Sequence, residues 1–130
     1  MKRGNRSMTK TFVFGMVMSA ALFAGVAGAQ AANPAEGEKV FAACKACHSL
    51  EAGKKGVGPS LAGVVGRKAG ASEGFAYSDA MKNSGITWDD AALKAYIENP
   101  KGSIPGNKMA YAGLKDAAKM DDLIAFLKTK

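Results

Sequence analysis

The chain has 130 residues, enough for one domain of ordinary size, with 48% hydrophobic and 22% charged residues, two cysteines and one histidine. This composition excludes a disordered, collagen-like or disulfide-stapled protein. The formal net charge is +7, but four basic residues lie within the first ten positions, which leaves 14 basic against 11 acidic residues elsewhere. Because no basic stripe with interleaved aromatic residues remains, the sequence does not favour nucleic-acid binding.

Residues 1–29 have the pattern of a cleavable secretory signal. A basic start is followed by an uncharged apolar run and then by the small residues Ala27-Gly28-Ala29, an A-x-A cleavage site. Cleavage before Gln30 leaves a single domain of residues 30–130, and cleavage after Ala31 is the other candidate. The apolar run is also long enough for an uncleaved membrane anchor, which stays as the alternative.

The mature domain shows helical patterns and no alternating strand pattern. A first helix is predicted from Pro34, after the N-cap Asn33, to about Cys47. A short helical turn is expected from Ser78 to Asn83.

A second main helix is predicted to start after Thr87 as its N-cap and to stop at Asn99-Pro100. A third begins near Asp116 and presents one apolar face, made of Met120, Leu123, Ile124 and Leu127. The fold class predicted from these elements is all-α.

Two glycine-rich loops, residues 49–77 and 99–114, separate the helices. Structureless segments of this length are uncommon inside a compact domain. A large buried cofactor would give both loops an apolar surface to pack on and would supply core volume that so short a chain lacks.

The segment Cys44-Lys45-Ala46-Cys47-His48 is C-x-x-C-H, the attachment signature of c-type haem. On a helix, positions i, i+3 and i+4 share a face, so both thiols can bond to the two vinyl groups of one porphyrin while the imidazole reaches its iron. We therefore predict one covalent haem c, attached through Cys44 and Cys47.

Three other interpretations of these residues are weaker. A thioredoxin-like dithiol needs a βαβ context that the chain does not show. A zinc site would need a carboxylate as its fourth ligand, because no further Cys or His remains. A disulfide between residues three apart on a helix would be strained and would leave His48 unexplained.

The single histidine excludes bis-histidine coordination of the iron, which leaves a methionine, a weaker donor such as lysine, or an open sixth position. The methionines outside the signal are Met81, Met109 and Met120. Met120 lies on an apolar helical face, where packing is the expected role, and Met81 lies in a short helical turn. Met109 lies in an irregular segment stiffened by Pro105, which favours it as the axial ligand.

The residues from 34 to 128 resemble the class I cytochromes c, in particular the bacterial relatives of the mitochondrial protein. Besides the haem motif, the matching blocks are Gly58-Pro59-Ser60-Leu61, Gly66-Arg67, Tyr77-Ser78-Asp79-Ala80, Gly85-Ile86-Thr87-Trp88, Tyr96-Ile97-Glu98-Asn99-Pro100, Ile104-Pro105-Gly106-Asn107-Lys108-Met109 and Asp122-Leu123-Ile124-Ala125-Phe126-Leu127. The resemblance implies the cytochrome c fold, with three main helices, short helical turns and long loops around the haem.

The resemblance also implies roles for single residues. His48 and Met109 would be the axial ligands, and the Pro59 carbonyl would accept a hydrogen bond from the His48 ring. Tyr96 would lie near the Met109 sulfur. The haem propionates would be held by Arg67, Tyr77, Ser78 and Trp88. Gly37 and Phe41 would meet Leu123 and Phe126 where the terminal helices cross. Met81 departs from the family, in which many members carry Asn at that position.

An iron held by imidazole and thioether has no vacant site for oxygen or peroxide, so we expect a one-electron carrier that is not an enzyme. By resemblance the protein is a monomer in the bacterial periplasm, and its partners would be a cytochrome bc complex and a terminal oxidase, reductase or reaction centre. Lysines near the exposed haem edge would steer it to acidic partner surfaces, the candidates being Lys45, Lys101, Lys108 and Lys115. A small haem peroxidase or a gas sensor is the alternative, if Met109 does not hold the iron.

Overall fold

A computed structural model describes residues 30–130 of the chain. In chain order its helices are α1 (Pro34–Phe41), α2 (Asp79–Lys82), α3 (Asp90–Glu98), α4 (Pro100–Ser103) and α5 (Ala117–Leu127). Among the described residues there is no strand, only one isolated bridge between Lys68 and Thr87. The predicted all-α fold is confirmed. The predicted signal lies outside the described residues.

The first helix begins as predicted, with the Asn33 side chain accepting a hydrogen bond from the Ala35 N–H at 2.9 Å. Its end was predicted wrongly: α1 stops at Phe41, and residues 42–47 form tight turns. The reason lies in the hydrogen bonds, because the N–H groups of Ala42 and Ala43 reach back three residues instead of four.

The start of the second main helix was also predicted wrongly. Asp89 caps α3, accepting a hydrogen bond from the Ala92 N–H at 2.8 Å, and Thr87 does not. Trp88 is held outside the helix, because its N–H donates to the Arg67 carbonyl and its own carbonyl accepts from the Gly66 N–H. The chain at Trp88 is therefore bonded to the neighbouring loop before α3 begins.

Short helices follow the same capping rules. The predicted turn at residues 78–83 is α2, capped by the Ser78 hydroxyl, which accepts from the Met81 N–H at 3.1 Å. Helix α4 was missed, because Pro100 was interpreted only as the end of the preceding helix. Proline suits the first position of a helix equally well, and the Asn99 side chain caps α4 through the Gly102 N–H.

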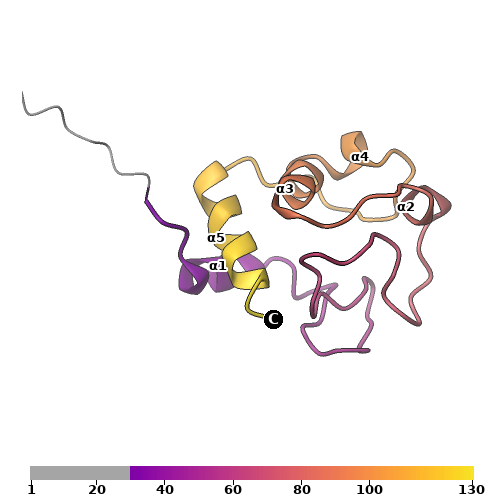
Figure 1. Cartoon of the computed structure of the whole chain (residues 1–130), viewed down its shortest axis with the longest axis horizontal. Helices are drawn as coiled ribbons and strands as arrows, with labels where there is room; N and C mark the ends of the chain where they lie inside the picture. Colours follow the sequence, from indigo (N-terminus) through magenta and orange to yellow (C-terminus); the bar gives the residue numbers. More distant parts are fainter. Residues whose placement is uncertain (1–29) are drawn as a thin grey trace, which may run out of the picture.

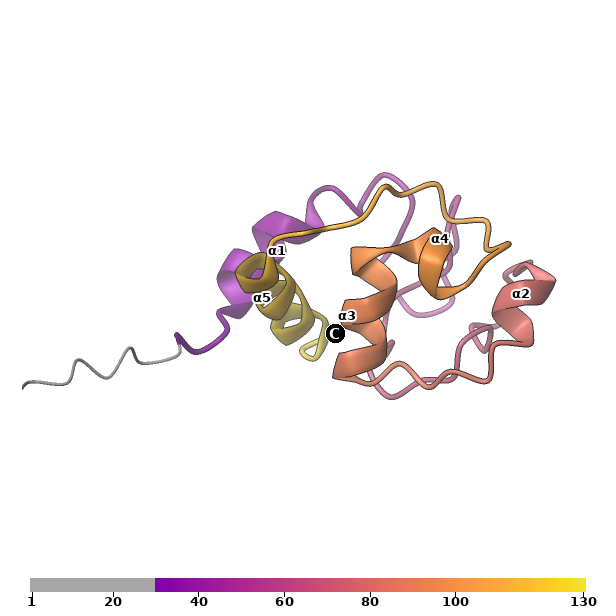
Figure 2. The same ribbon diagram turned by 90° about the horizontal axis from the view of Figure 1, so that it is seen from above.

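The terminal helices cross at one end of the molecule, as both views show (Figures 1 and 2). Gly37 packs directly under α5, and a Cβ placed there would lie 2.7 Å from the Phe126 Cβ. The rings of Phe41 and Phe126 lie 5.5 Å apart between centroids. The predicted crossing of these helices is confirmed, and it forms a core that includes Leu123, Ile124 and Leu127.

The rest of the fold surrounds a central cavity. In Figure 1 the loop of residues 49–77 runs along one side, and α2, α3 and α4 lie along the other. Residues 104–116 connect α4 to α5 without regular structure. The first predicted loop is present, and the second begins only at residue 104, because α4 occupies residues 100–103. Both loops contribute to the wall of the cavity.

Candidate functional site

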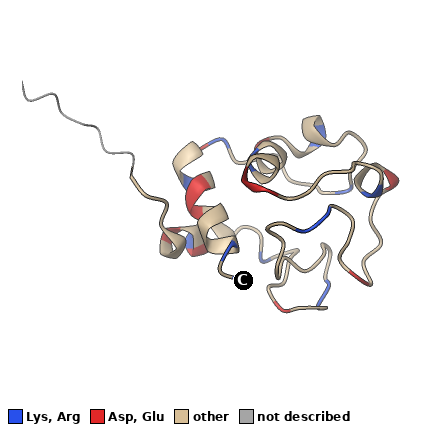
Figure 3. Cartoon of the chain, in the orientation of Figure 1, with Lys and Arg blue, Asp and Glu red and all other residues tan. Residues whose placement is uncertain are grey.

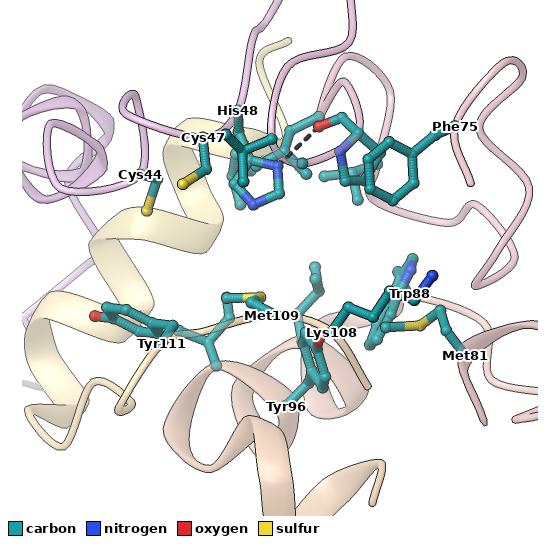
Figure 4. A pocket seen from close by; sticks show the side chains of 18 of the residues that line it. Cys44, Cys47, His48, Phe75, Met81, Trp88, Tyr96, Lys108, Met109 and Tyr111 are labelled. Atoms are coloured by element: carbon teal, nitrogen blue, oxygen red, sulfur yellow. Dashed lines mark hydrogen bonds between the residues drawn. The ribbon is translucent and has the colours of Figure 1, made fainter. Parts of the chain in front are cut away.

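Cys44, Cys47 and His48 lie on one wall of a cavity of about 300 Å³ (Figure 4). The Cys44 carbonyl accepts hydrogen bonds from the Cys47 N–H at 3.2 Å and from the His48 N–H at 2.9 Å. The C-x-x-C-H spacing therefore works through a tight turn after α1, and not through a continuation of the helix. Burial raises the pKa of the Cys44 thiol, and the nearby Cys47 adds to this.

Two contacts fix the orientation of the His48 imidazole. Its Nδ1 lies 2.8 Å from the Pro59 carbonyl, which can only accept, so Nδ1 carries the proton and donates. Gly58 allows the ring to pack against the backbone, since a Cβ there would lie 2.7 Å from Nδ1. These two contacts leave Nε2 facing into the cavity, with the lone pair that a metal ion would need (Figure 4).

Met109 lies on the opposite wall and faces His48 across the cavity (Figure 4). Tyr96 and Trp88 form part of the same wall, with their ring centroids 5.0 Å apart. Burial raises the pKa of Tyr96 to about 12. Met81 also lines the cavity, whereas Met120 is buried on the core face of α5 and is not part of the lining.

Apolar side chains make up most of the remaining cavity wall, which suits a flat hydrophobic ring system. They come from both terminal helices, from α3 and from the first long loop, and include Phe41, Leu61, Val64, Leu93, Ile97, Leu123 and Leu127.

Arg67 brings an unsatisfied hydrogen-bond donor to this wall. Its guanidinium donates to the carbonyls of Ala62 at 3.1 Å and Ser60 at 3.0 Å, while its buried Nε–H has no hydrogen-bond partner within the described chain. A buried donor without a partner is costly, so an acidic group of a bound ligand is expected to complete this site.

The cavity therefore fits the predicted cofactor. Two thiols, an imidazole nitrogen and a thioether face an apolar space, and this donor set is the one that holds haem c. Within residues 30–130 no three His, Cys, Asp or Glu side chains lie together in a way that could hold a metal ion. The strand that a thioredoxin-like motif requires is also missing from this part of the chain.

The structure brings the expected haem-contacting residues together. Arg67, Tyr77, Ser78, Trp88 and Tyr96 all line the cavity. The Ser78 hydroxyl is engaged in capping α2, and the Tyr77 hydroxyl accepts from the Ser72 N–H at 3.2 Å. Of the four candidate partner-facing lysines, Lys108 lines the cavity, and Lys45, Lys101 and Lys115 are exposed outside its lining.

Sequence reasoning missed several residues of the site. Val57, Phe75 and Tyr111 line the cavity, and Val57 is 79% exposed. Burial raises the pKa of Tyr111, and the Cys44 charge raises it further. The Asn107 side chain accepts hydrogen bonds from the Met109 N–H and the Tyr96 hydroxyl, both of residues that line the cavity. The position of Asn107 and Tyr111, each two residues from Met109, was the signal available.

The family model described as Cytochrome c matches residues 34–130. This chain belongs to the cytochrome c family. It is 58% identical over 95 residues to a cytochrome c2 iso-2 of Magnetospirillum fulvum, covering 73% of this chain and 99% of that protein. It is 52% identical over 120 residues to a cytochrome c2 of Blastochloris viridis, with 92% of each chain covered.

A solved structure shows the same fold. The chain aligns with cytochrome cH from Methylobacterium extorquens with a TM-score of 0.73 and 56% identity, covering 75% of this chain and 99% of that one. The predicted class I cytochrome c fold and its single covalent haem c are thus confirmed, and the protein is a monohaem electron carrier and not an enzyme. In residues 30–130 no helix is long and apolar enough to cross a membrane.

Proposed function

We propose that this cytochrome c carries single electrons between redox proteins of the bacterial periplasm, with the haem bonded to Cys44 and Cys47 and its iron held by His48 and Met109. The observation that carries the proposal is the placement of His48 and Met109 on facing walls of one apolar cavity, beside both cysteines (Figure 4). When bound, haem c supplies an iron that alternates between the ferric and ferrous states.

The residues of this chain perform three tasks in that cycle. The Pro59 carbonyl orients the His48 ring, so the ligand keeps its place when the charge on the iron changes. Apolar residues such as Leu93 and Leu127 exclude water from the cavity. Arg67, with its free Nε–H, offers a positive partner to a haem propionate. Little rearrangement then accompanies transfer of one electron.

The exposed lysines support docking to acidic partners. Six lysines form ion pairs with carboxylates, and among the described residues no such pair involves Lys45, Lys101, Lys108 or Lys115. Figure 3 shows basic residues along the loops and also on α2 and α4, and acidic residues on α1, α2, α3 and α5 and in the first long loop. Free positive charge near the cavity would steer the protein to a negatively charged surface, such as that of a cytochrome bc complex, an oxidase, a reductase or a reaction centre.

The axial ligands are tested by comparing Met109→Ala with Met120→Ala in the haem-loaded protein. We expect the ferrous wild-type protein and the Met120→Ala variant to ignore carbon monoxide, because the thioether of Met109 closes the sixth position. Met109→Ala should bind carbon monoxide and lose the sulfur-to-iron charge-transfer band of the ferric form. Rapid binding by the wild-type protein would reject Met109 as the ligand.

Export is tested by the mass of the mature protein recovered from the periplasm. A cut after Ala29 gives a chain that starts at Gln30, and a cut after Ala31 gives one that starts at Ala32. The two A-x-A sites share Ala29, so the distinguishing variants are Ala27→Leu, which should impair only the first cut, and Ala31→Leu, which should block only the second. A haem-loaded protein that keeps residues 1–29 and stays with the membrane would show the anchor instead.

A further inference from the structure

Asn107 uses the full hydrogen-bonding capacity of its side chain. Its Nδ2 donates to the carbonyls of Pro100 and Ile104, both at 2.7 Å. Its Oδ1 accepts from the Met109 N–H at 2.8 Å and from the Tyr96 hydroxyl at 3.3 Å. One side chain thus joins the start of α4, the following loop, α3 and the residue on the cavity wall.

These partners determine how the Asn107 amide is oriented. Two carbonyl oxygens face Nδ2 and the Met109 N–H faces Oδ1, so the reversed orientation would place acceptor against acceptor and donor against donor. By contrast, Asn99 lies at the exposed start of α4, and its side chain makes a single hydrogen bond, to the Gly102 N–H at 3.0 Å. The two asparagines therefore differ in their connection to the cavity.

The segment that carries Met109 has little other support. Residues 108–113 make no backbone-to-backbone hydrogen bond in the described chain, and the bond to Asn107 is the one hydrogen bond of the Met109 backbone. Hydrogen bonds to the rest of the protein resume after this segment. The Leu114 N–H donates to the Ile97 carbonyl at 3.0 Å, and the Lys115 ammonium donates to the Glu98 carbonyl. Loss of the Asn107 contacts would free the near end of this segment.

We propose that Asn107 is the positioning residue for Met109, holding its backbone so that the thioether stays directed at the cavity and the sixth iron position stays closed. The inference rests on ligation by Met109. Asn107 acts through its contacts with the backbone and with Tyr96, and it is not itself a ligand. Its removal raises the fraction of molecules in which the thioether has left the iron.

The test measures the affinity of the ferric, haem-loaded protein for imidazole, followed by its visible spectrum at neutral pH. Imidazole binds only when the sixth position is open, so its apparent affinity reports the open fraction. Loss of the hydrogen bonds at Asn107 should tighten apparent imidazole binding by about tenfold in Asn107→Ala. Asn107→Asp, which keeps the size and the acceptor but loses both donors, should shift the affinity in the same direction.

Two controls separate positioning from general destabilisation. Asn99→Ala removes a side-chain cap from the same short helix, and Ile124→Val loosens the packing of α5 away from the cavity lining. Both should lower Tm while leaving imidazole affinity within about twofold of wild type. If affinity instead rises with the loss of Tm in all variants, or stays unchanged in both Asn107 variants, the positioning role is wrong.

The experiment also distinguishes failure of the underlying ligand assignment. Met109→Ala gives the affinity of a fully open site, and the wild-type protein should bind imidazole much more weakly than this variant. Equal affinities in the two proteins would show that Met109 does not close the site, which would overturn the proposed ligand and the inference together. If the wild-type protein binds imidazole weakly and both Asn107 variants bind it with the wild-type affinity, only the positioning role of Asn107 is overturned.

Discussion

His48 and Met109 are positioned by different kinds of contact. The His48 ring is held directly, by the Pro59 carbonyl on one nitrogen and by the close packing of Gly58. Met109 is held through its backbone, by the Asn107 side chain, and its flexible thioether projects from there. The imidazole side of the site is therefore expected to be the more rigid, and the thioether side the more sensitive to substitution in surrounding residues.

Replacement of Arg67 should change both the stability and the reduction potential of the protein. In Arg67→Met the carbonyls of Ser60 and Ala62 lose their donors, which should lower the free energy of unfolding of the haem-loaded protein by about 1–3 kcal/mol. Removal of a positive charge near the iron should also lower the reduction potential, since a nearby cation disfavours the ferric state. Denaturant titration and redox titration measure the two effects.

Lys68→Met is the matched control, because Lys68 is exposed and adjacent to Arg67 in the chain. It removes the same charge without the buried contacts. A potential that falls equally in both variants would contradict a specific role of Arg67 at the cavity.

Tyr96 should make the free energy of unfolding depend on pH. Burial raises the pKa of Tyr96 to about 12, above its ordinary value of about 10. Above pH 10 the unfolded chain loses this proton first, so the stabilisation is present below pH 10 and is lost as the pH rises towards 12. In Tyr96→Phe the free energy of unfolding should therefore fall less steeply over this range. Urea titrations from pH 9 to pH 12 measure the slopes, and parallel curves would contradict the expectation.

At the scale of elements, the crossing of α1 and α5 depends on one missing side chain. Gly37 brings the two helices into contact, and a Cβ at this position would overlap the Asp122 carbonyl, a backbone atom that cannot turn away. Asp122 also accepts a hydrogen bond from the Asn33 N–H at 2.6 Å, which joins the start of α1 to α5. The crossing is thus determined by backbone contact as well as by the Phe41 and Phe126 rings.

Gly37→Ala is expected to destabilise this crossing by about 1–3 kcal/mol, because the helices must separate to admit the methyl group. Denaturant titration of the haem-loaded protein measures this loss. Glu38→Ala, at the adjacent exposed position, serves as the control and should change stability by less than about 0.5 kcal/mol. Equal stability of the Gly37→Ala variant and wild type would show that α1 can shift without cost.

At the level of the whole molecule, six lysines pair with carboxylates and the other lysines of residues 30–130 do not. Carboxylates neutralise lysines mostly within single turns, at Glu36–Lys39, Glu51–Lys54, Asp79–Lys82 and Asp116–Lys119. The lysines that remain free belong largely to the segments around the cavity (Figure 3). A modest net charge can therefore coexist with a locally positive surface, and the local surface governs encounter with a partner.

The unpaired lysines should affect the rate at which an anionic oxidant oxidises the ferrous protein. Replacing Lys45, Lys101, Lys108 and Lys115 by Gln should slow oxidation of the ferrous protein by hexacyanoferrate(III), an anionic oxidant, by about tenfold at low ionic strength. The dependence of the rate on ionic strength should flatten at the same time. Stopped-flow absorbance measures both quantities.

The control replaces four ion-paired lysines, Lys39, Lys54, Lys82 and Lys119, by Gln and so changes the net charge equally. Its rate should stay closer to wild type, because the position of the lysines and not the total charge is expected to govern the encounter. Equal slowing in both variants would mean that the overall charge, and not the position of these lysines, controls the encounter.

The sequence by itself determined the family, the cofactor and the order of all helices except α4. Cys44, Cys47 and His48 are contiguous, so their chemistry is visible without a fold, and capping residues such as Asn33 and Asp116 act on their nearest neighbours. The boundary at Asp89 was missed because Trp88 bonds to Arg67, which is remote in sequence. The end of α1 at Phe41 was missed because the turn of residues 42–47 keeps helix-like local bonds that reach back three residues.

Only the tertiary structure decided how Met109, Arg67 and Asn107 are arranged around the cavity. It places Met109 opposite His48, brings the free Nε–H of Arg67 to the same wall, and joins Asn107 to Pro100, Ile104 and Tyr96 at once. No periodicity encodes such contacts, since they link residues on separate elements. They depend on how the loops close around the cavity, and that closure is a property of the whole chain.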